Sequence, residues 1–165
     1  MTGVKLNFEL DARQAQAALN GLIKAGANLT PLMDTIGNYL ANETRHRFDT
    51  GAAPDGRAWI PSWRAREEGG KTLMKSRHLW DSITHRAGSN FVEVGSNVIY
   101  AAVQQFGATI RAKAGGKLIF KIGGGYRSMD QVTIPARPYL GMSKDDPVEI
   151  GAIVETYLKT AGNLA

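Results

Sequence analysis

The stretch YAAVQQFGATIRAKAGGKLIFKIGGGYRSMDQVTIPARPYLGM, residues 100–142, decides the layout of the fold. It starts with the apolar spacing of a helix, continues as a basic, glycine-rich segment and closes on a Pro-Ala-Arg-Pro sequence. Within the basic segment, residues 117–122 and 130–134 have strand-like patterns and lie on either side of three consecutive glycines. We predict that these two segments form a long hairpin with the glycines at its turn. We call residues 108–134 the arm, and we expect it to project from the core.

The rest of the chain mixes helix and strand patterns without regular alternation, which favours an α+β fold over a doubly wound sheet. The longest helical repeat covers residues 30–48, with Thr30 at its cap and Pro31 in its first turn. The other predicted elements are a strand over residues 5–10, a helix from residue 12, helical turns over 79–83, a hairpin of 83–86 and 91–94, a helix over 98–106 capped by Asn97 and ended by Gly107, and a last helix from Asp145. We expect one domain over residues 1–165, with an antiparallel sheet and hairpins packed against N-terminal, central and C-terminal helices.

Residues 49–72 are predicted to form an ordered loop, because the sequences DTG and PDG within it are typical of turns. Trp59 and Trp63 are large side chains, and we expect both to fix this loop to the core. Residues 64–71 are charged and contain two glycines, so we expect them to be mobile.

The net charge of +5 is concentrated in the middle of the chain. Residues 45–137 carry fifteen basic and seven acidic side chains, whereas residues 138–165 carry two basic and four acidic ones. A positive surface attracts nucleic-acid phosphates without reading their sequence, although many basic proteins bind no nucleic acid. There is no cysteine, and no apolar run is long enough to cross a membrane. The first residues show no export signal, so the sequence favours the cytoplasm.

The sequence contains no convincing reaction centre. His46, His78 and His85 lie on different predicted elements and have no metal-ligand spacing. Asp145 and Asp146 are explained by the start of a helix. The three consecutive glycines lack the strand-to-helix setting of a phosphate-binding loop. We therefore predict no catalytic residue, no cofactor and no metal, and we do not expect an enzyme.

Several separated motifs occur in a characteristic order. They are RHRF at residues 45–48, PDGRAW at 54–59, Leu73, SRHLWDSI at 76–83, VGSN at 94–97, YA at 100–101, QFG at 105–107 and PARPYLG at 135–141. In this order the chain resembles the phage virion morphogenesis family, the Mu-type tail completion proteins. The resemblance runs from about residue 42 to residue 141. Ser76 stands where family members usually have glycine, and the arm is longer than in the shortest members.

The resemblance implies a structural protein of a tailed phage or prophage, located in the tail or neck of the virion and made in the host cytoplasm. Such proteins act at the head–tail joint as tail terminators or neck components, generally as rings of copies, often six. The implied partners are further copies of the chain, tail-tube or terminator proteins and head-connector proteins, with non-specific contact to DNA in the bore and no membrane. The family carries no catalytic residues.

A ring subunit needs lateral contacts with its copies, and this gives the arm two alternative roles. Either the arm crosses to a neighbouring subunit, or its basic side chains meet DNA in the bore. A third reading is that the lysines and arginines only protect a sheet edge from aggregation. The residues predicted to contact a subunit or DNA are Arg111, Lys113, Lys117, Lys121, Arg127 and Arg137.

The remaining motif residues are predicted to have structural roles. Trp59, Trp80, Phe106 and Tyr139 are expected to fill the core or fix loops, and the glycines to meet backbone requirements. The arginines have two open readings. Arg45, Arg47, Arg77 and Arg137 bind either carboxylates within the fold, such as Asp49, Asp55 or Asp81, or a neighbouring subunit. The full structural set is Arg47, Phe48, Pro54, Gly56, Trp59, Leu79, Ser82, Ile83, Gly95, Tyr100, Phe106, Gly107, Pro135, Arg137, Pro138, Leu140 and Gly141.

Two other functions compete with this one. A small basic DNA-binding protein of a phage would use the positive middle of the chain directly, with steep salt dependence. A phage enzyme such as a cell-wall hydrolase would need a zinc site or a carboxylate pair, which the sequence does not offer.

Overall fold

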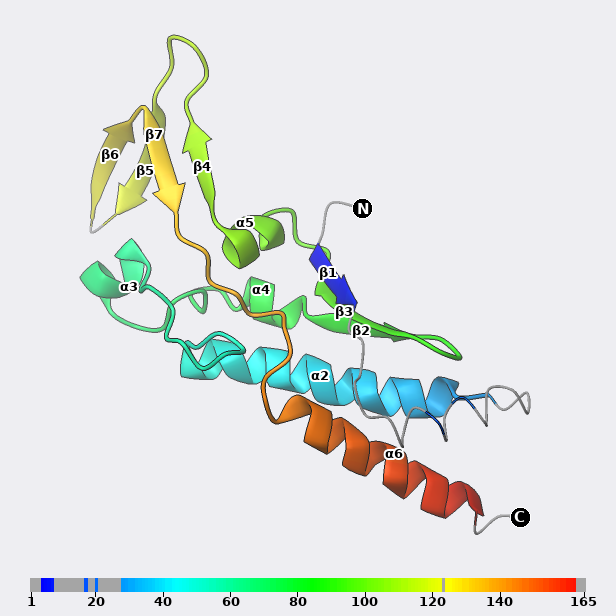
Figure 1. Cartoon of the computed structure of the whole chain (residues 1–165). Helices are drawn as coiled ribbons and strands as arrows, with labels where there is room; N and C mark the ends of the chain where they lie inside the picture. The colour runs from blue at the N-terminus through cyan, green and yellow to red at the C-terminus, as the bar shows by residue number, and fades with distance from the viewer. Residues whose placement is uncertain (1–3, 8–16, 18–19, 21–27, 123, 163–165) are drawn as a thin grey trace.

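The computed structural model describes residues 4–7, 17, 20, 28–122 and 124–162 (Figure 1). Its helices are α2 (Thr30–Thr50), α3 (Trp63–Glu68), α4 (His78–Asp81), α5 (Ala101–Phe106) and α6 (Asp146–Gly162). Its strands are β1 (Val4–Asn7), β2 (Thr84–Ala87), β3 (Val92–Ser96), β4 (Ala108–Arg111), β5 (Leu118–Ile122), β6 (Gly125–Met129) and β7 (Gln131–Ile134). The predicted α+β class is confirmed. The helix predicted from residue 12 lies outside the described residues.

Helix α2 forms the centre of the body, as its long apolar repeat predicts. Leu32, Ile36, Leu40 and Phe48 are buried along one face, which packs against β2, β3 and α6. Gly37 allows β2 of the sheet to lie close to α2, because a Cβ atom at residue 37 would lie 2.3 Å from Cδ2 of His85.

The start of α2 differs by one residue from the prediction. The N-cap is Leu29, and Thr30 is already helical, with Pro31 in the first turn as predicted. The side chain of Asn28 accepts a hydrogen bond from the backbone N–H of Thr30 at 3.1 Å. Asparagine therefore supplies the acceptor that we expected from threonine.

The body contains one antiparallel sheet with the strand order β1-β3-β2. The hairpin predicted over residues 83–94 is confirmed as β2 and β3, joined by a turn in which Gly88 N–H donates to Phe91 O at 2.9 Å. Strand β1 pairs with the other edge of β3, with Lys5 opposite Gly95. A Cβ atom on Gly95 would lie 2.2 Å from the carbonyl oxygen of Val4, so glycine permits this close pairing.

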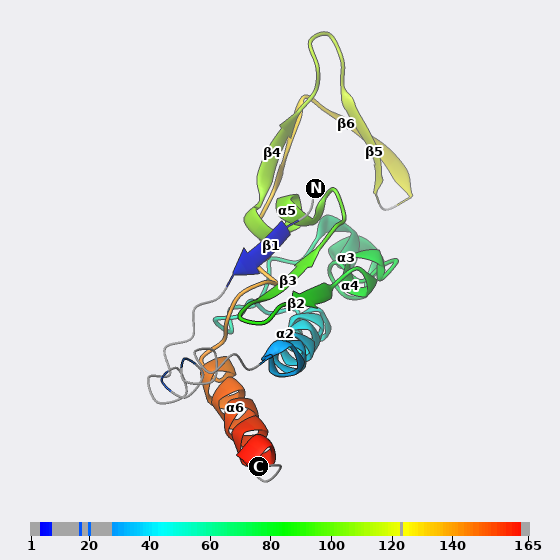
Figure 2. The ribbon, with the colours of Figure 1, turned by 90° about the vertical axis from the view of Figure 1, so that its right-hand side faces the viewer.

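The arm is built from two nested two-stranded ladders. Strand β4 pairs with β7 from Ala108 opposite Ile134 onwards, and β5 pairs with β6 in a hairpin that folds back beside this ladder. The prediction that residues 117–122 pair with 130–134 is wrong. Residues 125–129 are the partner of β5, because the chain reverses within the glycines and Ile122 already stands opposite Gly125. Figures 1 and 2 show the arm rising from the body on the side opposite α6.

The loop over residues 49–72 contains a helix that we did not predict. Helix α3 begins after Ser62, whose side chain accepts a hydrogen bond from Ala65 N–H at 3.2 Å. Residues 64–68, part of the segment that we expected to be mobile, thus belong to a short helix. Trp59 is buried as predicted, whereas Trp63 is 37% exposed.

The start of α5 shifts from its predicted position, whereas the start of α6 agrees closely with the prediction. Helix α5 begins at Ala101 rather than Val98, and the hydroxyl of Ser96, not Asn97, accepts from Val98 N–H at 3.1 Å. Asp145 stands immediately before α6, as predicted, and its carbonyl accepts the first helical hydrogen bonds.

Candidate assembly surfaces

The base of the arm is clamped to α5 by one buried glutamine. The side-chain oxygen of Gln105 accepts hydrogen bonds from the backbone N–H groups of Tyr139 and Leu140, both at 3.0 Å. Its amide nitrogen donates to Leu140 O at 2.9 Å. The Tyr139 hydroxyl donates to Ala101 O at 3.0 Å, and burial raises the pKa of this phenol. The segment that follows the arm, which contains Tyr139 and Leu140, is thus fixed to α5, the helix that precedes the arm.

Gly107 turns the chain from α5 into the arm. Its φ is +74°, and a Cβ atom there would lie 2.8 Å from Ala136 N and 2.9 Å from Ile134 O. Both the backbone conformation and the close approach require glycine. The predicted backbone role of Gly107 agrees with this geometry.

The β4–β7 ladder of the arm has one apolar and one polar face. Side chains of directly paired residues lie on the same face of an antiparallel ladder. Ala108 and Ile110 of β4 therefore share a face with Val132 and Ile134 of β7. On the other face the hydroxyls of Thr109 and Thr133 lie 3.1 Å apart.

The β5–β6 hairpin folds back towards α3. On one of its faces the guanidinium carbon of Arg127 lies 5.9 Å from the ring centroid of Trp63. On the other face Ile119 and Tyr126 are 69% and 77% exposed. The hairpin therefore touches its own subunit on one face and leaves apolar side chains uncovered on the other.

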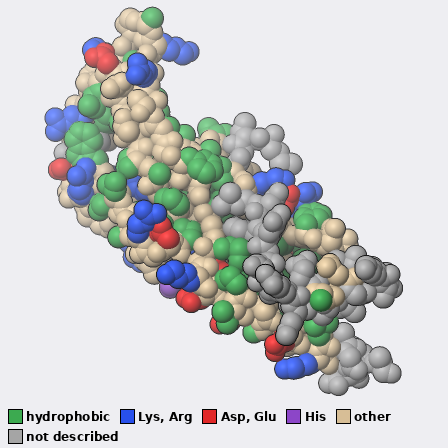
Figure 3. Space-filling view, in the orientation of Figure 1, with side chains coloured by type: hydrophobic (Ala, Val, Ile, Leu, Met, Phe, Trp, Pro, Cys, Tyr) green, Lys and Arg blue, Asp and Glu red, His purple; other side chains and the backbone are tan. Residues whose placement is uncertain are grey.

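The predicted basic contact residues of the arm lie on its surface. Arg111, Lys113 and Lys121 are exposed and form no ion pair with another described residue. Lys117 pairs with Asp130 at 2.5 Å across the arm. Figure 3 shows lysine and arginine side chains spread along the arm among apolar ones.

Exposed apolar side chains gather on the arm and at its base. Seven of the eleven large exposed hydrophobic residues in the described chain fall between residues 99 and 129. They are Ile99, Tyr100, Phe106, Ile110, Ile119, Tyr126 and Met129. The prediction that Phe106 fills the core is wrong, because this side chain is 63% exposed. Exposed apolar side chains are therefore concentrated in this part of the described chain.

Arg47 lies inside the fold and binds a carboxylate there. Its guanidinium donates to the carbonyls of Tyr139 and Gly141 at 3.0 and 2.8 Å and to Oδ2 of Asp146 at 3.1 Å. Burial lowers the pKa of Arg47, and the neighbouring Asp146 counteracts this. Tyr39 donates to the other oxygen of Asp146, and burial followed by this hydrogen bond raises the pKa of Tyr39. Internal pairing was one of the two open readings for Arg47, but Asp146 was not among the expected partners, because a helix start already explained it.

Arg137 is also buried, but no described carboxylate pairs with it. Its Nε donates to Ile60 O at 2.8 Å and its Nη1 to Gln104 Oε1 at 3.2 Å. Its backbone N–H donates to Gln104 O at 2.8 Å. Burial alone lowers the pKa of this guanidinium.

Trp80 lies between two other motif arginines. The guanidinium carbons of Arg77 and Arg45 lie 4.2 and 5.5 Å from its ring centroid. Arg45 also donates to Ile83 O at 2.6 Å and to the Asn42 side chain at 3.0 Å. Neither arginine forms an ion pair within the described chain, so these two hold an aromatic ring instead of a carboxylate.

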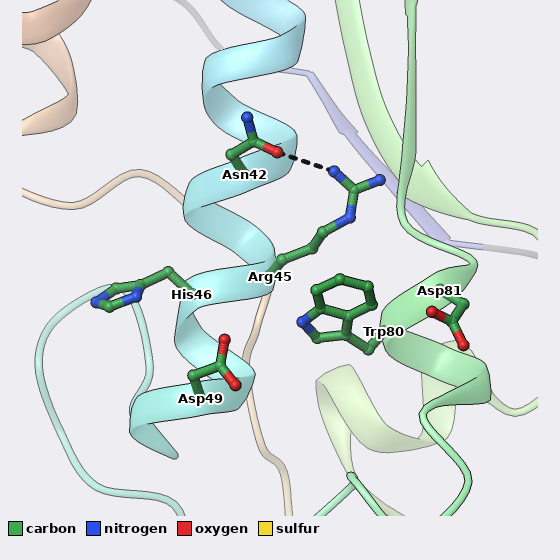
Figure 4. A pocket seen from close by; sticks show the side chains of 6 residues that line it. All are labelled: Asn42, Arg45, His46, Asp49, Trp80 and Asp81. Atoms are coloured by element: carbon green, nitrogen blue, oxygen red, sulfur yellow. Dashed lines mark hydrogen bonds between the residues drawn. The ribbon is translucent and has the colours of Figure 1, made fainter.

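A surface pocket of about 440 Å³ opens beside Trp80 (Figure 4). It is lined by Asn42, Arg45 and His46 of α2, and by Asp49, Trp80 and Asp81. The indole nitrogen of Trp80 is fully buried and has no hydrogen-bond partner among the described residues. The lining carries charges of both signs, which gives it no preference for a cationic or an anionic ligand.

Several of the remaining structural motif residues pack in the core, whereas Gly56 and Tyr100 are exposed. Phe48 is fully buried, with its ring centroid 5.5 Å from Trp59 and 5.2 Å from Tyr139. The indole of Trp59 donates to Pro138 O at 2.9 Å. Leu79, Ile83 and Leu140 are buried. The Ser82 hydroxyl donates a hydrogen bond to Leu79 O and is hydrogen-bonded to the Ser96 hydroxyl. Gly56 has a φ of +83°, and Pro54 occupies the space where a Cβ atom of Gly141 would point.

The described residues contain no group of three or more histidines, aspartates or glutamates that could hold a metal ion. Within the same part of the chain, no helix is long and apolar enough to cross a membrane.

Together, the geometry shows a projecting arm with exposed apolar side chains on it and at its base. A family model described as the phage virion morphogenesis family matches residues 10–159, and the chain belongs to this family. It is 30% identical over 149 residues to the Mu-like prophage FluMu G protein 2 of Haemophilus influenzae, covering 90% of this chain and 92% of that protein. It is 29% identical over 158 residues to the provisionally named capsid assembly protein G of Escherichia phage Mu, covering 88% of each. No solved structure matches.

Proposed function

We propose that this protein is a non-enzymatic structural component that completes the phage tail or neck at the head–tail joint. It acts as a ring of copies, six in number, in which each arm reaches a neighbouring subunit. Its partners above and below the ring are tail-tube or terminator proteins and head-connector proteins. The protein resides in the tail or neck of the virion after its synthesis in the host cytoplasm.

The observation that carries this proposal is the uncovered apolar surface of the arm. An arm that only touched DNA would need cations, whereas this arm also exposes Ile110, Ile119 and Tyr126 to solvent. Exposed apolar side chains on a projecting ladder favour burial against protein. A contact between two different surfaces of identical subunits closes into a ring when the rotation allows. The name of the phage Mu relative, a capsid assembly protein, is consistent with action where the head meets the tail.

Deletion of the gene tests the position of the protein in assembly. Electron microscopy of the resulting particles should show filled heads beside unattached tails, or tails of irregular length. Irregular tail lengths would indicate failed termination, and tails of normal length would indicate failed joining. Normal, infectious virions would contradict the structural role.

The competing function is direct DNA binding, which the exposed cations Arg111, Lys113 and Lys121 favour. Two matched triple variants separate the roles of the arm. Replacing Ile110, Ile119 and Tyr126 with serine removes the apolar surface, and replacing the three cations with glutamine removes charge. We expect the serine variant to lose oligomerisation and particle joining while the glutamine variant keeps both. Loss of joining only in the glutamine variant, with salt-dependent duplex binding by the natural protein, would favour DNA contact instead.

A further inference from the structure

A second pocket, of about 280 Å³, lies between α3, α4 and α5 beneath the arm. Three cations line it, namely Arg64, Lys75 and Arg137, and none of its described lining residues is acidic. Tyr100 and Ser76 contribute hydroxyl groups to the same lining. The pocket is therefore positively charged, and its other polar groups, the hydroxyls and the Gln104 amide, are neutral.

Arg137 is the exceptional member of this set. Only 5% of its surface is exposed, yet neither of its side-chain hydrogen bonds goes to a carboxylate. Buried charges in proteins are nearly always paired, because an unpaired buried charge costs several kcal/mol. Arg47 follows that rule through Asp146. Arg137, the other buried arginine of the described chain, does not.

One nitrogen of Arg137 remains available to a ligand. Nη2 makes no hydrogen bond to a described residue, whereas Nε and Nη1 are both occupied. Among the described residues, the only fully buried side-chain nitrogen or oxygen without a partner is the indole nitrogen of Trp80. Nη2 therefore keeps an opening, and the pocket that Arg137 lines provides it.

The other two cations leave the pocket short of negative charge. Arg64 donates to two backbone carbonyls, Gly69 O at 3.0 Å and Lys71 O at 2.6 Å, and forms no ion pair with a described residue. Lys75 pairs with Glu68 at 3.3 Å, with its side chain 70% exposed. Only one of the three cations thus has a counter-charge.

The backbone beside the pocket is strained. Leu73 and Arg77 are the two non-glycine residues with positive φ in the described chain, at 64° and 57°. They lie at the two ends of the segment that supplies Leu73, Lys75 and Ser76 to the lining. Such strain is commonly retained where a site needs a particular loop conformation.

We infer that this pocket is an oxyanion site that receives a carboxylate side chain from another protein chain, which pairs with Arg137. A DNA backbone presents its phosphates along a broad cylinder, which fits poorly with a pocket whose lining arginine, Arg137, is only 5% exposed. A protruding aspartate or glutamate can enter it and accept a charge-assisted hydrogen bond from Nη2. This inference deepens the proposed function by giving the chemistry of one partner contact.

Two sources can supply the carboxylate, a second copy of this chain or a different virion protein. A copy offers Asp145 and Glu149 at the start of α6, where both are exposed and form no ion pair with a described residue. A carboxylate enters the pocket in either case, and the experiment below distinguishes the two sources.

The test places the photo-crosslinking residue p-benzoylphenylalanine at Tyr100, which lines the pocket and is 39% exposed. After irradiation of assembling particles, mass spectrometry identifies the peptide joined to this position. We expect a peptide from another protein chain that contains aspartate or glutamate at the contact. A peptide of this protein indicates a neighbouring copy, and any other peptide identifies a different virion protein. Crosslinks only to DNA, or only within the same subunit, would overturn the inference.

A matched pair of substitutions gives a second readout. Arg137→Met removes the charge with little change of volume and should reduce the yield of joined particles by about tenfold or more, as for loss of one partner of a buried interfacial pair. Arg66→Met removes an exposed arginine of α3 that does not line the pocket, and should leave the yield unchanged. The melting temperature of the isolated Arg137→Met subunit should stay close to that of the natural protein, because the lost hydrogen bonds are offset by removing an unpaired buried charge. Equal losses of yield in both variants would contradict the inference.

The two proposals fail separately. Normal virions after gene deletion would refute the role at the head–tail joint, whereas the crosslink reports on the pocket whichever part of the particle the protein occupies.

Discussion

Arg47 and Asp146 form a buried ion pair that joins the end of α2 to the start of α6, with Nη2 and Oδ2 3.1 Å apart. The side chains are 7% and 1% exposed, and both have further hydrogen bonds, from Arg47 to two carbonyls and to Asp146 from Tyr39 and Ser143. This pair therefore holds together segments that lie a hundred residues apart in the sequence.

Substituting Asp146 with asparagine should destabilise the protein strongly. The amide keeps the size of the carboxylate but leaves the Arg47 charge buried without a counter-ion, which costs about 3–5 kcal/mol. Urea unfolding would measure this loss in the free energy of unfolding. Asp145→Asn is the control, because its side chain is exposed, and we expect a change within about 0.5 kcal/mol. A similar small change for both variants would show that the pair adds nothing to stability.

Substituting Gln105 with alanine should loosen the base of the arm. Three buried backbone groups of Tyr139 and Leu140 lose their partner, and the stability loss should be about 3 kcal/mol. Hydrogen exchange of the Tyr139 and Leu140 amides should accelerate more than that of α2. Gln131→Ala changes an exposed glutamine on β7 and serves as the control. Unchanged protection of the two amides in the Gln105 variant would refute the clamp.

The two tryptophans of the loop after α2 should behave differently when truncated. Trp59 is 6% exposed and packs on Phe48, so Trp59→Ala should cost about 3–5 kcal/mol. Trp63 touches Arg127 of the hairpin, so Trp63→Ala should leave global stability within about 1 kcal/mol. Hydrogen exchange of residues 118–129 should nevertheless increase in the Trp63 variant, because the hairpin loses its contact with α3. Equal protection of the hairpin in the natural protein and this variant would show that α3 does not restrain it.

Glu93 should make the protein sensitive to acid. The hydrogen bond from Lys5 and then that from Arg86 lower the pKa of Glu93 below its usual value. A carboxyl whose pKa is lower in the folded state contributes stability above its unfolded pKa of about 4.3, and this contribution disappears as the pH falls through the folded pKa. Glu93→Gln should therefore flatten the acid side of a plot of melting temperature against pH. Glu155→Gln, on exposed α6, should leave that slope unchanged, and equal slopes for all three proteins would contradict the prediction.

The elements that could be predicted from the sequence are those with a local signal. The repeat of apolar residues identified α2, and the spacing of β2 and β3 identified their hairpin. The pairing of the arm was mispredicted because the sequence between Gly123 and Ile134 does not show which residues stand opposite β5. Only the turn length sets that register.

The assembly surfaces were less predictable because their defining contacts are non-local. Arg137 meets Ile60 and Gln104, which lie 77 and 33 residues away in the sequence. No pattern around an arginine shows whether a carboxylate will face it after folding. The exposure of Phe106 could not be predicted either, because an apolar residue on a helix can face either the core of its own subunit or the surface.

Because β4 pairs with β7 from the base of the arm upwards, the length of this ladder can vary. The β4–β7 ladder begins with Ala108 opposite Ile134 at the base, so residues added in register to both strands would lengthen the arm and carry the β5–β6 hairpin away from its contact with α3. Each such pair would move the tip outwards by about 3.4 Å. In the ring proposed above, the length of this ladder would set how far each arm reaches towards a neighbouring subunit.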